Sequence, residues 1–359
     1  MSSRADLVLT LLEASRFPGI AWKRFAVGQA EVTARGLNDR YIQTCIAQSK
    51  CLLNRIGGDM DGAANCLDNI DRGSLLNTTL DNRMHSTMGK AAIQRSLNCI
   101  QVDYVSDARN VLEGWSPLGQ SPSSMEVTVL FRRDIILGRV LRFRGEFEES
   151  RTHLMDSLET AKRHKHLIFD EDLRDLTCDL ADTLLELGDP VTAEKYLRAE
   201  IRQNRNCGSS SSGGLLELSL ADALFAQHRF EEAEQLCLAV QCRPGLLRFE
   251  KLRLQVTLAK IRHINGDNEE ASRHWAEALV AVGKFPNENC ATRVIVSSVC
   301  DILSRQEGVS TDNSLLDQSK RHLCLLDERE RSGGFRCWIA GMRHWAEYLS
   351  RHTSVRSRL

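Results

Sequence analysis

The stretch DIILGRVLRFRGEFEESRTHLMDSL, residues 134–158, decides the fold. Apolar side chains recur in it every three or four residues, which is the spacing of an amphipathic helix and not of a strand. Gly145 interrupts this pattern in the middle and favours a turn. We therefore predict two helices that fold back on each other at Gly145. Gly138 and Ser150 are the small residues at which the two backbones can approach closely.

The same pattern returns three times further along the chain. The small residues of the first helices lie at 138, 181, 221 and 259, at intervals of 43, 40 and 38 residues. A period between about 20 and 50 residues is typical of a solenoid of stacked repeats. Weaker copies precede these repeats around residues 57–67 and 105–115. Residues 296–303, 315–326 and 335–349 predict further helices, the last of which would cap the stack with a polar outer face.

The repeats resemble the tetratricopeptide repeat family. The resemblance is specific over about residues 130–285 and rests on Leu137, Gly138, Leu141, Gly145, Phe147, Ser150, Leu154, Ser157 and the segments 229–233 and 266–271. It implies an all-α solenoid of about six or seven antiparallel helical hairpins with a C-terminal capping helix. Periods near 40 exceed the roughly 34 residues of the standard unit. They look like the longer-helix variant in the sensor regions of some bacterial transcription activators and in many fungal proteins.

The domain organisation follows from the repeats. We predict a single solenoid over residues 1–350 and a flexible tail over 351–359. Segments 116–124 and 206–214 are rich in Ser, Gly or Pro and predict loops. Similar hairpins lie on both sides of each loop, so we interpret the loops as insertions and not as linkers between domains. Near the N-terminus, Ser3 and Asp6 predict a helix-capping box.

Composition and motifs argue against several classes of function. The chain has 359 residues and a formal net charge of -1, so it lacks the overall positive field that attracts nucleic acid. No apolar run reaches the roughly 20 residues of a membrane helix. The twelve cysteines lack the two-residue spacing of zinc or redox motifs, which favours free, buried thiols in a reducing compartment. Signatures of phosphate loops, nucleophile elbows and zinc helices are absent. We therefore predict no enzyme activity, no cofactor and no metal site.

Charged residues form a stripe along the first helices of the repeats, which the resemblance places on the concave, partner-binding face. The predicted partner-binding residues are Arg132, Arg139 and Arg142 in one helix, Asp175 and Asp182 in the next, Asp222 in the third, and Arg253 and Lys260 in the fourth. Pairs seven residues apart share a helix face. One interpretation is a groove for an extended or helical peptide. The other is a set of exposed ion pairs between repeats, Arg139 with Asp182 and Asp222 with Lys260.

The function predicted from these features is a non-catalytic protein–protein interaction scaffold or regulatory adaptor. The alternative is an enzyme or accessory protein of a small-molecule biosynthetic pathway that uses a cavity in the solenoid. The acidic middle of the stripe argues against RNA as a partner. A homodimer through the C-terminal helix is a further possibility, because Trp338 and Trp345 share one face of it. We expect a cytoplasmic protein; the alternative is peroxisomal import through Ser357, Arg358 and Leu359, which resemble the Ser-Lys-Leu signal.

Overall fold

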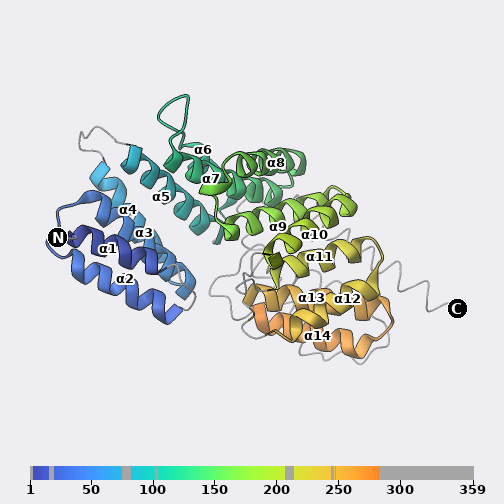
Figure 1. Cartoon of the computed structure of the whole chain (residues 1–359). Helices are drawn as coiled ribbons and strands as arrows, with labels where there is room; N and C mark the ends of the chain where they lie inside the picture. Colours follow the sequence, from blue (N-terminus) through green and yellow to red (C-terminus); the bar gives the residue numbers. More distant parts are fainter. Residues whose placement is uncertain are drawn as a thin grey trace. The chain divides into compact units, whose positions relative to one another are not determined.

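The computed structural model describes residues 3–15, 20–74, 82–101, 104–206, 214–243, 246 and 248–282. In these residues every regular element is a helix (Figure 1), which confirms the all-α prediction. Contacts divide the chain into two compact units, residues 1–136 and 137–359, and the boundary falls within helix α7. The single solenoid over residues 1–350 stays a prediction. The predicted helices after residue 295 and the C-terminal tail lie outside the described residues.

Unit 1 contains three helical hairpins and the first part of a fourth. Its helices are α1 (Arg4–Ala14), α2 (Ile20–Ala34), α3 (Arg40–Gly57), α4 (Met60–Ser74), α5 (Asn82–Gln101), α6 (Val105–Glu113) and the start of α7 (Ser124–Phe143). Helices pack in consecutive pairs, α1 with α2, α3 with α4 and α5 with α6. The two weak repeats of the sequence are thus confirmed as the second and third hairpins. The capping box is also confirmed, since Ser3 and Asp6 each accept a hydrogen bond from the other's backbone N–H.

Unit 2 contains the repeats that the sequence shows most clearly. It comprises the end of α7, α8 (Phe147–Arg163), a short 3-10 helix (Lys165–Leu167), α9 (Asp170–Glu186), α10 (Pro190–Asn206), α11 (Leu215–Ala226), α12 (Phe230–Gln241), α13 (Arg248–Ile264) and α14 (Asn268–Val282). Together the described parts of both units hold seven hairpins, which are the six copies that the sequence predicted and the hairpin of α1 and α2, which it did not. The loop predicted at 116–124 is non-helical up to Ser123, where α7 follows. Residues 207–213 lie outside the described part.

The turns of five hairpins share one backbone conformation. One or two residues after the end of the first helix lies a residue with positive φ, and these residues are Gly58, Gly145, Gly188, His228 and Gly266. In the α7–α8 turn, the N–H of Glu146 donates to the carbonyl of Leu141 at 2.9 Å, and the N–H of Gly145 donates to that of Arg142 at 3.0 Å. These two bonds define a Schellman motif, which provides hydrogen-bond donors for backbone carbonyls at the helix end that have no partner within the helix. The positions 145, 188, 228 and 266 recur at the predicted intervals of 43, 40 and 38 residues.

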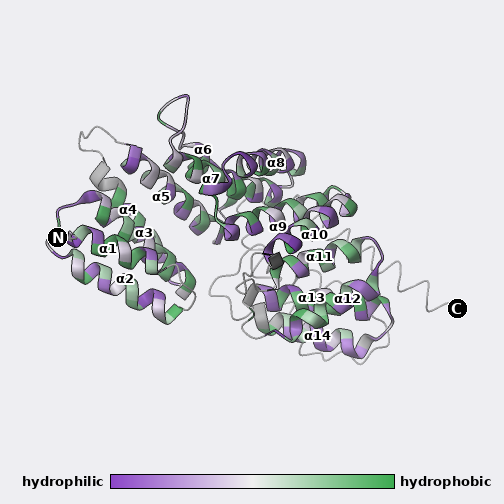
Figure 2. Cartoon of the chain, in the orientation of Figure 1, coloured by the Kyte–Doolittle hydropathy of each residue, from purple (hydrophilic) through white to green (hydrophobic). Residues whose placement is uncertain are grey.

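Small residues set the distance between the two helices of each hairpin. A Cβ atom on Gly138 would lie 2.6 Å from Cγ of the fully buried Leu154. Ser150 Oγ donates to the carbonyl of Gly138 at 2.7 Å, so a short side chain of α8 binds the backbone of α7 directly here. The equivalent positions of later hairpins hold alanines that are at most 1% exposed, namely Ala181, Ala193, Ala221, Ala233, Ala259 and Ala271. Most helices have apolar residues toward their neighbours and polar residues elsewhere (Figure 2), whereas nine of the twelve residues of α11 are buried.

Candidate functional site

The first helices of the hairpins in unit 2 form a continuous layer. Helix α11 contacts both α9 and α13, and α7 joins α9 through the ion pairs described below. We call α9, α11, α13 and the part of α7 after Ile136 the first-helix layer. It carries most of the charged stripe that the sequence predicted.

At one end of the layer, two arginines of α7 share one aspartate of α9. The Arg139 guanidinium binds Asp179 in a bidentate manner, with Nε at 3.0 Å from Oδ1 and Nη2 at 2.7 Å from Oδ2. Arg142 Nη2 lies 3.4 Å from Asp179 Oδ1 and 3.6 Å from Asp182 Oδ2. Planar guanidinium groups suit such paired contacts with carboxylates. Asp179 and Asp182 thus hold α9 to α7.

A third arginine continues the chain of ion pairs to the other first helices. Arg253 of α13 donates from Nη2 to Asp182 Oδ1 at 2.7 Å and from Nε to Asp222 Oδ2 at 2.6 Å. Thr257 Oγ1 donates to the second oxygen of Asp222 at 2.7 Å. We call Arg139, Arg142, Arg253, Asp179, Asp182 and Asp222 the arginine–aspartate network. It joins four first helices, and its formal charges cancel.

The electrostatics of the network keep its members ionised. Burial by itself would raise the pKa of Asp182, but the guanidinium groups of Arg253 and Arg142 outweigh it and hold that pKa below its usual range. Asp179 raises the pKa of Arg139. Burial opposes ionisation of Arg253, yet the two carboxylates it binds raise its pKa. Loss of one member would leave its partner charged and partly desolvated, which is typically far more costly than loss of an exposed pair.

The structure brings together five of the eight predicted residues: Arg139, Arg142, Asp182, Asp222 and Arg253. Asp175 lies on α9 with an oxygen 3.4 Å from its neighbour Arg174, and it adds to the field on Arg139. Burial lowers the pKa of Lys260, and the nearby Asp222 carboxylate offsets part of this effect. Arg132 belongs to unit 1. There the pKa of Arg55 is lowered, mainly by burial and to a smaller extent by the positive charge of Arg132. A partner-binding role for all eight stays a prediction.

Ion pairs join neighbouring repeats, as one of the two interpretations expected. Arg139 pairs with Asp179 and not with the predicted Asp182, and Asp222 pairs with Arg253. These pairs are also less exposed than expected, since the side chains of Asp179 and Arg253 are only 6% and 12% exposed. Sequence reasoning missed Asp179 and Thr257. The sequence does contain a signal for both. Asp179 lies four residues after Asp175 and Thr257 four residues after Arg253, so each shares a helix face with a predicted residue.

Two ionisable groups beside the network keep contact with solvent. Glu186 at the end of α9 is exposed, and Lys260 of α13 is partly exposed with its Nζ 6.0 Å above the ring centre of Phe225. Surrounding protein atoms raise the pKa of Glu186 and lower that of Lys260. Each of the two charges partly offsets this effect on the other. A partner that approached the layer would meet these two side chains.

In the part of the chain that the structure describes, no three His, Cys, Asp or Glu side chains gather as metal ligands. Its cysteines are free thiols, and burial raises the pKa of Cys178, in α9, to about 12. None of the described helices combines the length and apolar character needed to cross a lipid bilayer.

Comparisons with known proteins agree with this architecture. The family model described as "Tetratricopeptide repeat" matches residues 132–154, which include the Gly138–Ser150 crossing. No curated protein sequence matches the chain.

Three similar solved structures are Rap proteins. A Rap protein complexed with competence and sporulation factor has a TM-score of 0.59 at 12% identity, over 99% of this chain and 95% of its own. The apo form of RapI has a TM-score of 0.56 at 11% identity, over 77% of this chain and 97% of its own. The Rap conjugation gene regulator of plasmid pLS20, in complex with the Phr* peptide, has a TM-score of 0.51 at 11% identity, over 99% of this chain and 96% of its own. This chain therefore has the fold of a tetratricopeptide-like helical-repeat protein.

Proposed function

We propose that this protein is a non-catalytic adaptor that binds an extended segment of a protein or peptide partner along the first-helix layer of unit 2. The observation that supports the proposal best is the arginine–aspartate network, which links four successive first helices into one polar stripe. The similar Rap structures add support, since one is described in complex with the Phr* peptide and another with competence and sporulation factor.

The network suits binding because its side chains are already fixed. Asp182 and Asp222 each bind Arg253 through one carboxylate oxygen and keep 21% of their side-chain surface exposed. A carboxylate can accept several hydrogen bonds, so backbone N–H groups of an extended segment could bind there without any reorganisation. In a solenoid the hairpins use their apolar faces against one another, which leaves the polar stripe as the recognition surface.

The charges of the layer indicate what kind of segment fits. Asp179 and Asp182 already neutralise Arg139 and Arg142, so this end of the layer has no cationic excess for a strongly acidic partner. Glu186 and Lys260 carry opposite charges beside the network. We therefore propose a segment of mixed charge, with a basic residue toward Glu186 and an acidic residue toward Lys260.

The test uses peptides selected from a random display library on the immobilised full chain. Their dissociation constants are then measured for the double variant Glu186→Gln, Lys260→Gln, which keeps the net charge. We expect affinity to fall by about tenfold or more, the effect of losing one or two charge-assisted contacts. The matched control is Glu159→Gln, Lys162→Gln, which removes an exposed ion pair of 2.6 Å on α8. Equal affinities of the two double variants would contradict the proposal.

A further inference from the structure

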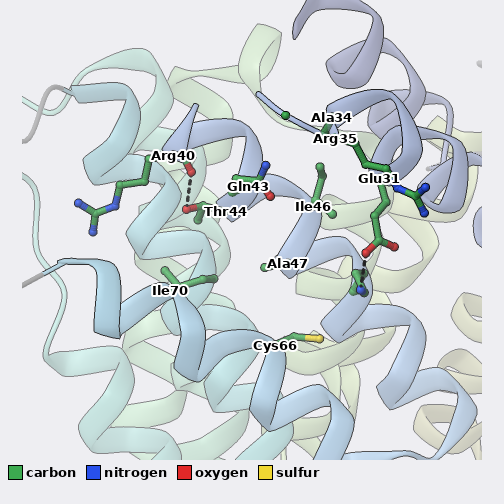
Figure 3. Close-up of a pocket in the computed structure, with 12 residues that line it drawn as sticks. Glu31, Ala34, Arg35, Arg40, Gln43, Thr44, Ile46, Ala47, Cys66 and Ile70 are labelled. Carbon is green, nitrogen blue, oxygen red and sulfur yellow. Dashed lines mark hydrogen bonds and ion pairs between the residues drawn. The ribbon is translucent and has the colours of Figure 1, made fainter. Parts of the chain in front are cut away.

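Unit 1 contains a cavity that the first-helix layer does not involve. It has a volume of about 490 Å³ and lies among α2, α3 and α4 (Figure 3). That volume is within the range of about 300–1,000 Å³ typical of sites for small organic molecules.

One part of the cavity wall is apolar. Ile46 and Ala47 of α3 and Cys66 and Ile70 of α4 line it. Residues 66 and 70 are four apart, so both lie on the face of α4 that is turned toward α3. Thr44 adds little polarity, because its hydroxyl already donates to the carbonyl of Arg40 at 2.9 Å. This part of the wall suits a hydrocarbon body.

The rest of the lining carries more positive than negative charge. Arg35, Arg40 and Lys50 contribute three cations, against the single carboxylate of Glu31. Glu31 and Arg35 lie at one edge of the cavity and Arg40 at the opposite edge (Figure 3). In the part of the chain that the structure describes, the Arg35 guanidinium forms no ion pair, and Glu31 binds Lys50 at 2.9 Å.

The Glu31–Lys50 pair is an exchangeable contact. Its side chains are 50% and 40% exposed, and such ion pairs typically contribute only about 0–1 kcal/mol. A ligand anion that reaches both Arg35 and Lys50 would therefore compete with Glu31 at little cost.

We propose that this cavity binds a small organic anion, with a carboxylate or phosphate group between Arg35 and Lys50 and an apolar body over Ala47 and Cys66. The proposal concerns unit 1 only, so its failure would leave the peptide-binding function of unit 2 untouched.

The first experiment measures binding of octanoate, octyl phosphate and 1-octanol to the full chain by isothermal titration calorimetry. The three probes share one apolar body and differ in the head group. We expect at least one anionic probe to bind at least tenfold more tightly than 1-octanol, and the tighter of the two anions identifies the natural head group. Absence of binding by both anions, or equal binding of the alcohol, would overturn the proposal.

Two variants of exposed arginines test the role of the cationic edge. Arg35→Gln should weaken binding of the anionic probe by about tenfold, since it removes a charge-assisted contact. Arg24→Gln is the matched control, because Arg24 is an exposed arginine of α2 that does not line the cavity. Its affinity for the probe should stay within twofold of that of the unchanged protein. Equal effects of the two variants would show that the probe senses only the general charge of the surface, which contradicts a site in the cavity.

Protection of a cysteine locates the bound probe. Cys66 lines the cavity and is partly exposed, whereas Cys242 is exposed in unit 2. The anionic probe should slow alkylation of Cys66, followed by peptide mass spectrometry, by at least threefold and leave the rate at Cys242 unchanged. Unchanged alkylation of Cys66 at saturating probe would overturn the assignment.

Discussion

Replacement of Gly138 by alanine should destabilise the protein, although alanine is the better helix former. Gly138 lies within α7, where the change to alanine would normally contribute about 1 kcal/mol of stability. The new Cβ would lie 2.6 Å from Leu154 Cγ and 2.7 Å from its Cδ2. Leu154 has no exposed surface and cannot move aside into solvent.

The magnitude follows from these two opposing effects. Insertion of a methyl group into a packed interior typically costs about 1–3 kcal/mol, and contacts this short belong at the upper end of that range. The Ser150–Gly138 hydrogen bond resists a simple widening of the crossing. After subtraction of the helix-propensity gain, we expect Gly138→Ala to lower the free energy of unfolding by about 1–2 kcal/mol.

Urea denaturation followed by far-UV circular dichroism measures this change. Gly28→Ala is the matched control, because Gly28 lies within α2 and a Cβ there meets nothing within 4 Å. This control should raise the free energy of unfolding by up to about 1 kcal/mol. In the Gly138→Ala background, Leu154→Ala should lower the free energy of unfolding by less than it does alone, because the shorter side chain at 154 makes room for the new Cβ at 138. A rise in midpoint for Gly138→Ala similar to that for Gly28→Ala would refute the close crossing.

Three further predictions concern the turn, the network and the thiols. His228 has a φ of 62°, where the other four hairpin turns of this conformation have glycine, so His228→Gly should raise the free energy of unfolding in urea by up to about 1 kcal/mol. Arg253 and its neighbours hold the pKa of Asp182 in the folded protein below the unfolded value of 3.8. The ionised carboxylate therefore stabilises the fold fully above about pH 3.8, and this stabilisation is lost as the pH falls from there through the folded pKa. The stability deficit of Asp182→Asn at about pH 6 should therefore shrink at about pH 3, as paired denaturation curves would show. Because burial raises the pKa of Cys178 to about 12, a disulfide reagent at about pH 8 should modify the exposed Cys242 first, and equal rates would contradict the burial of Cys178.

The repeat register could be predicted from the sequence because it depends on local chemistry. Gly145, Gly188 and Gly266 mark turns that need positive φ, and small residues mark the crossings. Even the turn at His228 was correctly placed, since the intervals on either side fix it. The hairpin of α1 and α2 was not predicted as a repeat, because its segment lacks this register of turn and small residue.

The partners within the site could not be predicted in detail. Asp179 and Asp182 lie less than one helical turn apart on α9, so sequence spacing cannot decide which of them Arg139 reaches. That choice depends on how far α7 is shifted along α9, which tertiary packing sets. The cavity of unit 1 was missed for a similar reason: it arises where three helices meet, and its lining residues are of ordinary types in no motif.

The most direct test of partner binding by the first-helix layer is to locate a bound peptide. A selected peptide with a photo-reactive residue is cross-linked to the full chain, and the cross-linked residues are identified by mass spectrometry. Binding along the layer predicts cross-links on α7, α9, α11 and α13, lost when an unlabelled copy of the peptide competes. Cross-links confined to α8, α10, α12 and α14, or to unit 1, would contradict it.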